Sequence, residues 1–110
     1  MKSKTLLTVI CTMVLLTASS SAADAKTNYD KNCAKCHGPD GKGQTRMGKQ
    51  AGARDYTDEK VQAELDDARA FKSIKEGQTI KGKEAMKPFG DKLSDDEIKE
   101  LVTLMRAFKK

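Results

Sequence analysis

The stretch Cys33-Ala34-Lys35-Cys36-His37 decides how the rest of this chain is interpreted. Two thiols three residues apart can form thioether bonds to the two vinyl groups of one haem. The histidine that follows the second thiol can then ligate the iron. His37 is also the only histidine in the 110 residues. The motif therefore predicts one covalently attached haem c with one nitrogen ligand from the protein.

Three other chemistries use the same cysteine spacing. A thioredoxin-like redox pair lies in a βαβ context, and no alternating strand pattern flanks this motif. A structural zinc ion needs four ligands, whereas the chain after residue 23 offers two thiols and one adjacent histidine. A plain disulfide is the third alternative, but it leaves the composition of the core unexplained.

Large apolar residues are scarce in residues 24–110. Leu, Ile, Val and Phe number only twelve there, which is below the roughly 20% at which an ordinary core becomes doubtful. A small domain also buries a smaller share of its surface than a large one. A flat macrocycle at the centre would supply the missing apolar surface, so the composition independently favours a haem.

The N-terminus has the three parts of an export signal, namely a basic start, an apolar run and a region of small residues, at Lys2 and Lys4, at 6–16 and at 18–25. We therefore expect a signal peptide over residues 1–23, cleaved after Ala23 or Ala25, and a periplasmic protein. The apolar run is short of the roughly 20 residues that a spanning helix needs. An uncleaved membrane anchor is the alternative, and stable membrane insertion is not expected.

Cleavage would change the composition in two ways. It removes Cys11, which leaves only the two motif cysteines, and it removes two lysines but no acidic residue, so the net charge of +5 falls by two. A nucleic-acid surface would need more positive charge and more aromatic platforms. The remaining residues 24–110 fit a single domain, which we expect to be a monomer.

Hydrophobic periodicity predicts an all-α domain with three to four short helices and long loops. A first helix is expected over 28–35, ended by the glycine-rich turn 38–43. Residues 44–56 and 78–91 are expected to be loops. A capped helix start at 57–59 leads towards residue 65, and a further helix begins at Asp66 or Asp67 and stops at Gly77.

The last helix has the clearest signal. Ser94 and Glu97 form a capping-box pattern at its start. Apolar residues then recur every three or four positions, at Ile98, Leu101, Val102, Met105 and Phe108. This stripe predicts a helix whose one face is buried in the core.

In order and spacing, the whole of residues 24–110 resembles the class I, soluble, monohaem c-type cytochromes. The matching elements are the motif with its following glycine (33–38), the turn 40–43, a methionine in 86–89, and a closing helix after residue 93. The resemblance implies a small class I cytochrome c fold, wrapped around one haem that Cys33 and Cys36 hold covalently. It also implies that His37 is one axial ligand and that a late loop supplies the other, where Met86 matches.

Two other methionines compete with Met86 for the iron. Met47 lies nearer the motif and is the rival ligand, whereas Met105 lies on the stripe of the last helix and is expected to fill the core. The sequence departs from the family where Lys87 separates Met86 from Pro88. It departs again where Leu104 and Met105 stand in place of a frequent aromatic, so Tyr29 is expected to pack against Leu101, Leu104 or Met105.

Supporting contacts of the haem remain open at this point. A ligating histidine normally donates its other ring N–H to a carbonyl, and Pro39 and Ala53 are the candidate acceptors for His37. Tyr56 and Arg54 are candidates for a haem propionate, with ordinary exposed surface residues as the alternative.

The function expected from the resemblance is one-electron transfer without catalysis of a substrate reaction. Lysines that could surround the exposed haem edge and steer acidic redox protein partners are Lys35, Lys42, Lys81, Lys83 and Lys87. One alternative is a gas- or peroxide-binding sensor or enzyme with an open sixth position. Another is an electron-donating subunit of a membrane redox complex.

Overall fold

The structure is a computed structural model that describes residues 22–110. The signal peptide predicted over residues 1–23 lies outside the described residues, except for its last two. Both predicted cleavage points, after Ala23 and after Ala25, fall in the first helix. Within residues 22–110, no helix has the length and apolar character required to cross a bilayer.

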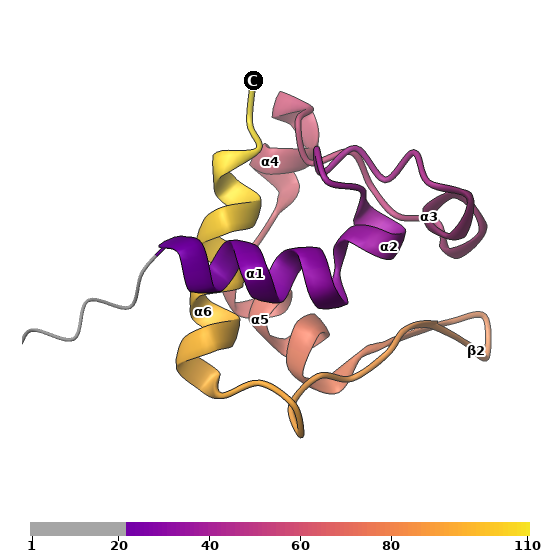
Figure 1. Ribbon diagram of the computed structural model, residues 1–110. Coiled ribbons are helices and arrows are strands. Elements are labelled where there is room, and N and C mark those ends of the chain that lie inside the picture. The colour runs from indigo at the N-terminus through magenta and orange to yellow at the C-terminus, as the bar shows by residue number, and fades with distance from the viewer. Residues whose placement is uncertain (1–21) are drawn as a thin grey trace, which may run out of the picture.

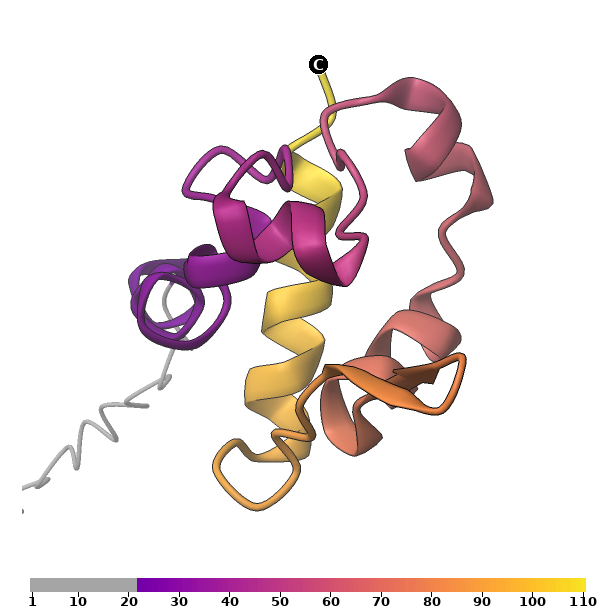
Figure 2. The same ribbon diagram turned by 90° about the vertical axis from the view of Figure 1, so that its right-hand side faces the viewer.

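The described chain forms six α-helices and one two-stranded antiparallel sheet (Figures 1 and 2). The helices are α1 (Ala22–Asn32), α2 (Ala34–His37), α3 (Arg46–Ala51), α4 (Glu59–Glu64), α5 (Asp67–Glu76) and α6 (Asp95–Ala107). The strands β1 (Gln78–Ile80) and β2 (Lys83–Met86) form a hairpin between α5 and α6. The predicted helical fold is confirmed, with the hairpin as an addition.

Helix α6 is the centre of the core. Ser94 caps it, with the Ser94 side chain accepting from the Glu97 N–H and the Glu97 carboxylate accepting from the Ser94 N–H, as the sequence predicts. Four residues of the predicted stripe are buried, namely Ile98, Leu101, Val102 and Met105. Ile98 and Leu101 retain at most 1% of their accessible surface. The role of Met105 as core filler is therefore confirmed.

Helices α1 and α5 pack on α6 and complete the core. Figures 1 and 2 show α1 crossing α6, and Tyr29 of α1 is 3% exposed within the core cluster that includes Leu101 and Met105. The Tyr29 ring lies 5.2 Å from the ring of Phe108, measured between centroids. Phe108, just past the end of α6, therefore supplies an aromatic contact that was not among those predicted for Tyr29.

The helices α4 and α5 begin where the sequence predicts. Asp58 caps α4 and Asp66 caps α5, each side chain accepting from a backbone N–H of the first turn. Gly77 ends α5 with a φ of 77°, which glycine adopts without the steric penalty of a Cβ. Ala70 and Ile74 of α5 are buried against α6.

One polar cluster joins α4 to the end of α6. The buried Gln62 amide donates to the carbonyls of Tyr56 and Met105 at 2.6 and 2.9 Å. Arg106 donates to the carbonyls of Gln62 and Leu65, which lie at the end of α4. These bonds hold α4, and through Tyr56 the segment before it, against the C-terminal helix.

The predicted loop over 44–56 was wrong in part, because it contains α3. Thr45 caps this helix by accepting from the Gly48 N–H at 2.9 Å. Only Gly48 is buried in α3, so the helix has no apolar stripe. Periodicity could not reveal a helix that packs through a glycine backbone.

The predicted loop over 78–91 was also wrong in part, because it contains the hairpin. All three residues of β1 are exposed, and a bulge interrupts the pairing between Gln78 and Thr79. A strand pattern arises when one face is buried and the other is exposed. These strands are too short and too exposed to produce it.

The first helix is longer than predicted and is interrupted. It begins at Ala22 rather than at Asn28, and it ends at Asn32, with Cys33 between α1 and α2. The Cys33 N–H still donates to the Tyr29 carbonyl at 2.8 Å, so the helical path continues through the break. The prediction of three to four helices was low because α2 and α3 lack apolar periodicity.

Candidate haem site

The motif forms a single helical turn. The His37 N–H donates to the Cys33 carbonyl at 2.9 Å, and the Gly38 N–H donates to the Ala34 carbonyl at 2.8 Å. Residues at positions i, i+3 and i+4 of a helix share one face. Cys33, Cys36 and His37 have this spacing, so the helical turn places the two thiols and the imidazole on the same side.

Both motif cysteines are free thiols, so they do not form the plain disulfide considered above. Burial, with the Cys36 thiol as the second cause, raises the pKa of Cys33 to about 11. At neutral pH the Cys33 side chain is therefore an uncharged thiol. No cluster of three or more His, Cys, Asp or Glu side chains in residues 22–110 could hold a metal ion such as zinc.

The imidazole of His37 is neutral and incompletely bonded. Burial lowers the pKa of His37 below its ordinary value, so the ring carries no charge at neutral pH. Its Nδ1 atom is buried and has no hydrogen-bond partner within residues 22–110, so neither the Pro39 nor the Ala53 carbonyl bonds to it. Buried polar atoms are usually paired. A neutral imidazole beside two thiols suits a haem iron, and the residues present therefore fit haem c.

Helix α3 lies directly on the motif. The Thr45 hydroxyl donates to the Cys36 carbonyl at 2.8 Å. A Cβ on Gly48 would lie 2.1 Å from the same carbonyl oxygen, so only glycine allows this contact. The Gly43 N–H also donates to the His37 carbonyl at 2.8 Å. Sequence reasoning missed Thr45 and Gly48, whose only signal is a threonine three residues before a glycine.

Two tyrosines flank the motif. The Tyr29 hydroxyl donates to the Gly38 carbonyl at 2.5 Å, and burial raises the pKa of Tyr29. The Tyr56 ring lies 5.6 Å from the His37 ring between centroids, and burial raises the pKa of Tyr56 also. Arg54, the other residue considered for a propionate, is exposed and donates to the Glu64 carboxylate.

The three methionines after the motif occupy different environments. Met105 is buried in the core, and Met47 is 45% exposed on α3. Met86 is the last residue of β2 and is half-buried against the core cluster. A Cβ on Gly77 would lie 2.6 Å from the Met86 carbonyl oxygen, so the end of α5 closely approaches the Met86 backbone.

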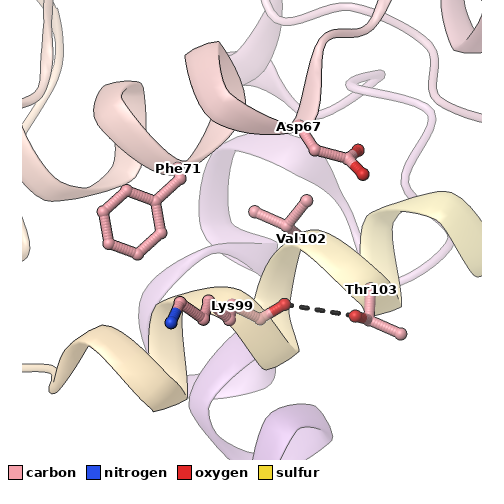
Figure 3. A pocket seen from close by; sticks show the side chains of 5 residues that line it. All are labelled: Asp67, Phe71, Lys99, Val102 and Thr103. Carbon is pink, nitrogen blue, oxygen red and sulfur yellow. Dashed lines mark hydrogen bonds between the residues drawn. The ribbon is translucent and has the colours of Figure 1, made fainter.

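A shallow pocket lies away from the motif, between α5 and α6 (Figure 3). Its volume is about 230 Å³, and its lining residues are Asp67, Phe71, Lys99, Val102 and Thr103. Arg106 already binds the Asp67 carboxylate at 2.8 Å, and the Thr103 hydroxyl donates to the Lys99 carbonyl at 3.2 Å. The pocket is smaller than the roughly 300 Å³ of ordinary ligand sites, and its carboxylate and hydroxyl groups already have partners in the protein.

Comparison with known proteins agrees with this geometry. The family model described as cytochrome c oxidase, cbb3-type, subunit III matches residues 20–105. No curated protein matches the sequence. A solved structure of the c-type cytochrome KustC0563 is 40% identical and superposes with a TM-score of 0.72, covering 79% of this chain and 99% of that one. A tyrosine-to-phenylalanine mutant of KustC0563 is 38% identical, with a TM-score of 0.69 and coverages of 78% and 99%.

The family match and the structural match both agree with the haem-attachment motif. The family match spans most of the chain and includes Cys33, Cys36 and His37. The structural match extends over nearly the whole length of a c-type cytochrome. Members of such families carry haem c and serve as haem-based electron carriers. This chain belongs to the c-type cytochromes, in the family described by subunit III of cbb3-type cytochrome c oxidase.

Proposed function

We propose that this protein is a soluble, periplasmic one-electron carrier with one haem c. Cys33 and Cys36 would hold the haem covalently, and His37 and Met86 would be the axial ligands. When bound, the haem would supply a centre that accepts and releases one electron. The observation that carries the proposal is the shared face of two free thiols and a neutral imidazole whose buried Nδ1 lacks a partner within residues 22–110.

The surrounding residues support this role by holding the motif in place. Tyr29 bonds to the Gly38 carbonyl, Thr45 bonds to the Cys36 carbonyl, and the Gly43 N–H bonds to the His37 carbonyl. A carrier works best when its ligands keep one geometry in both oxidation states. These three bonds restrict movement of the motif without involving the thiols or the imidazole.

The positions of the methionines favour Met86 as the second ligand. Helix α3, which carries the exposed Met47, packs on α2. In Figure 1, the hairpin that ends at Met86 lies below α2 and α3. The half-buried Met86 therefore suits this position better than the exposed Met47.

The burial of Ala25 supports one of the two predicted cleavage points. Ala25 is 5% exposed in the first turns of α1. Cleavage after Ala25 would remove this buried residue from the mature protein, whereas cleavage after Ala23 would retain it. We therefore propose that the mature protein begins at Asp24.

One experiment tests the haem, the ligands and the cleavage together. Protein produced by a host that matures c-type cytochromes should have the mass of residues 24–110 plus one haem. The ferric protein should show the weak far-red absorption band that marks a methionine sulfur on the iron. The Met86→Ala variant should lose this band and the Met47→Ala control should retain it.

The same measurement addresses a gas- or peroxide-binding function. Such a function needs an open sixth position on the iron. If the far-red band were absent from the unmodified protein and carbon monoxide bound readily to the reduced form, the carrier proposal would be wrong.

A second candidate function is a subunit of a membrane redox complex. The description of the matching family favours it, since that family is named for an oxidase subunit. The 99% coverage of KustC0563, a chain described only as a c-type cytochrome, favours the free carrier. Size separation of a gently lysed cell extract distinguishes them, because a carrier elutes as a small coloured protein and a subunit elutes with the complex.

A further inference from the structure

The tip of the hairpin exposes an apolar side chain among positive charges. We define the hairpin tip as residues 80–83, which are Ile80, Lys81, Gly82 and Lys83. Ile80 is 49% exposed, and within the described residues Met47 is the other large apolar side chain of this kind. Figure 1 shows the hairpin projecting from the body of the molecule.

The strand register brings Ile80 and Lys83 together. These residues are paired across the hairpin, and paired residues point to the same face of a sheet. Lys81 lies in the turn between them. The hairpin tip therefore presents one branched apolar side chain with an ammonium group beside it and another at the turn.

The turn itself is made less stable by its first residue. Lys81 has a φ of 51° and Gly82 a φ of 76°, which are the two left-handed positions of a tight hairpin turn. Asn, Asp or Gly suits the first of these positions better than a lysine. Lys81 is the only non-glycine residue with positive φ in residues 22–110. Folding alone does not explain a lysine here.

The tip lysines are not neutralised. Neither Lys81 nor Lys83 forms an ion pair within residues 22–110, whereas Lys72 and Lys75 on the neighbouring helix α5 pair with Glu76 and Asp95. Both tip lysines are exposed. Their charge is therefore available to attract carboxylates on another molecule.

We propose that the hairpin tip is the contact through which an acidic redox protein docks. Carboxylates of the partner would bind Lys81 and Lys83, and an apolar spot between them would receive Ile80. The inference rests on the proposed electron-carrier function. Lys83 precedes Met86 by three residues, or about 10 Å along a strand. A partner at the tip would therefore lie about 10 Å along the strand from Met86, the proposed ligand at the base of the hairpin.

A gold electrode coated with a mixed carboxylate- and methyl-terminated monolayer serves as the probe, because it presents the proposed partner chemistry. Adsorption of the haem-loaded protein is measured by voltammetry at low ionic strength. The variant Lys81→Glu/Lys83→Glu should adsorb at least ~10-fold more weakly. The control Lys109→Glu/Lys110→Glu changes the net charge equally at the C-terminus, and it should change adsorption by less than ~2-fold.

The apolar contact has its own matched pair. Ile80→Ser should weaken adsorption about 3-fold, because a half-exposed isoleucine gains modestly from burial. Met47→Ser removes a similarly exposed apolar side chain on α3 and should have no effect. Equal effects of the tip and control variants, for either pair, would overturn the proposal.

Two further readouts separate this proposal from others. All variants should keep the visible spectrum and midpoint potential of the unmodified protein. If the unmodified protein showed no reversible haem reduction and oxidation, the carrier function, and not the docking site, would be refuted. Binding to phosphatidylglycerol vesicles is measured in parallel. If the tip variants lost vesicle binding but kept monolayer adsorption, the occupant would be a lipid surface and the protein-docking proposal would be wrong.

Discussion

The motif segment and the hairpin are held in opposite ways. The motif turn is bound on several sides, by Tyr29 from α1, by Thr45 and Gly48 from α3, and by the core that buries Cys33. The hairpin is held at its base. There the Phe89 N–H donates to the Ile74 carbonyl at 2.9 Å, and the strands themselves are largely exposed.

This difference indicates how firmly the protein holds each of the two proposed ligands in position. His37 would be fixed by the polypeptide before the iron is bound, since its turn is already enclosed. Met86 lies at the end of an exposed element and depends on a few contacts with α5. We therefore expect ligation by Met86 to be lost more easily than ligation by His37. The following predictions test this contrast.

The largest effect is expected from crowding the motif. Gly48→Ala places a Cβ 2.1 Å from the Cys36 carbonyl oxygen, and we expect about 3 kcal/mol of destabilisation in guanidinium unfolding of the haem-loaded protein. Gln50→Ala on the exposed side of the same helix is the control. If the two variants unfolded within ~0.5 kcal/mol of each other, α3 would not be a support of the motif.

The next effect is expected at the base of the hairpin. Gly77→Ala introduces a Cβ at a φ of 77° and 2.6 Å from the Met86 carbonyl oxygen. We expect a loss of about 2 kcal/mol in stability and a weaker far-red methionine band.

Gly52→Ala provides the control for this variant. Gly52 has a φ of 74° with nothing within 4 Å of an added Cβ, so it measures the backbone strain alone. The methionine band should be unchanged in Gly52→Ala. An equally weakened band in both variants would mean that the contact with Met86 is irrelevant.

A smaller effect is expected from the hydroxyl of Tyr29. Tyr29→Phe keeps the ring on Phe108 but leaves the Gly38 carbonyl without this donor, which should destabilise the protein by about 1 kcal/mol. The visible spectrum should not change, because the turn keeps its other bonds. A shifted unfolding midpoint with an altered spectrum would show that the motif is less rigid than we infer.

The smallest effect is expected from Glu97, which joins α6 to α1. Its carboxylate accepts from the Ser94 N–H and from the Asn28 amide at 2.9 Å, and these bonds lower the pKa of Glu97. Because the pKa of Glu97 is lower in the folded protein, its ionised carboxylate stabilises the fold fully above the ordinary pKa of a glutamate. This stabilisation is lost as the pH falls through the pKa of Glu97 in the folded state.

Thermal unfolding of the haem-loaded protein with and without Glu97→Gln checks this sign. The advantage of the unmodified protein should be present at neutral pH and should disappear in acid. An advantage that grew on acidification would contradict the assignment.

The clearest sequence signals came from residues that act through local rules. Ser94 and Glu97 predicted the start of α6, the stripe from Ile98 to Met105 predicted its buried face, and Gly77 predicted the end of α5. Capping and periodicity depend on neighbours in sequence, so they can be recognised without a fold.

Other features were not recognisable because they depend on distant contacts. Helix α3 packs through Gly48, which has no side chain to create a period. The hairpin buries neither face fully, so its strands do not alternate. The contact between Tyr29 and Phe108 joins residues from opposite ends of the domain.

By itself, the sequence determined the family, through the order and spacing of its motifs, and the pair of thiols and the single histidine. It also determined the bounds of α4, α5 and α6, because capping and periodicity depend on residues that are close along the chain. Only the tertiary structure decided that α3 covers the motif, that the half-buried His37 has a buried Nδ1 unpartnered among the described residues, and that Met86 is half-buried while Met47 is exposed. Burial is a property of the folded chain. It arises when segments far apart in sequence exclude water from the same place.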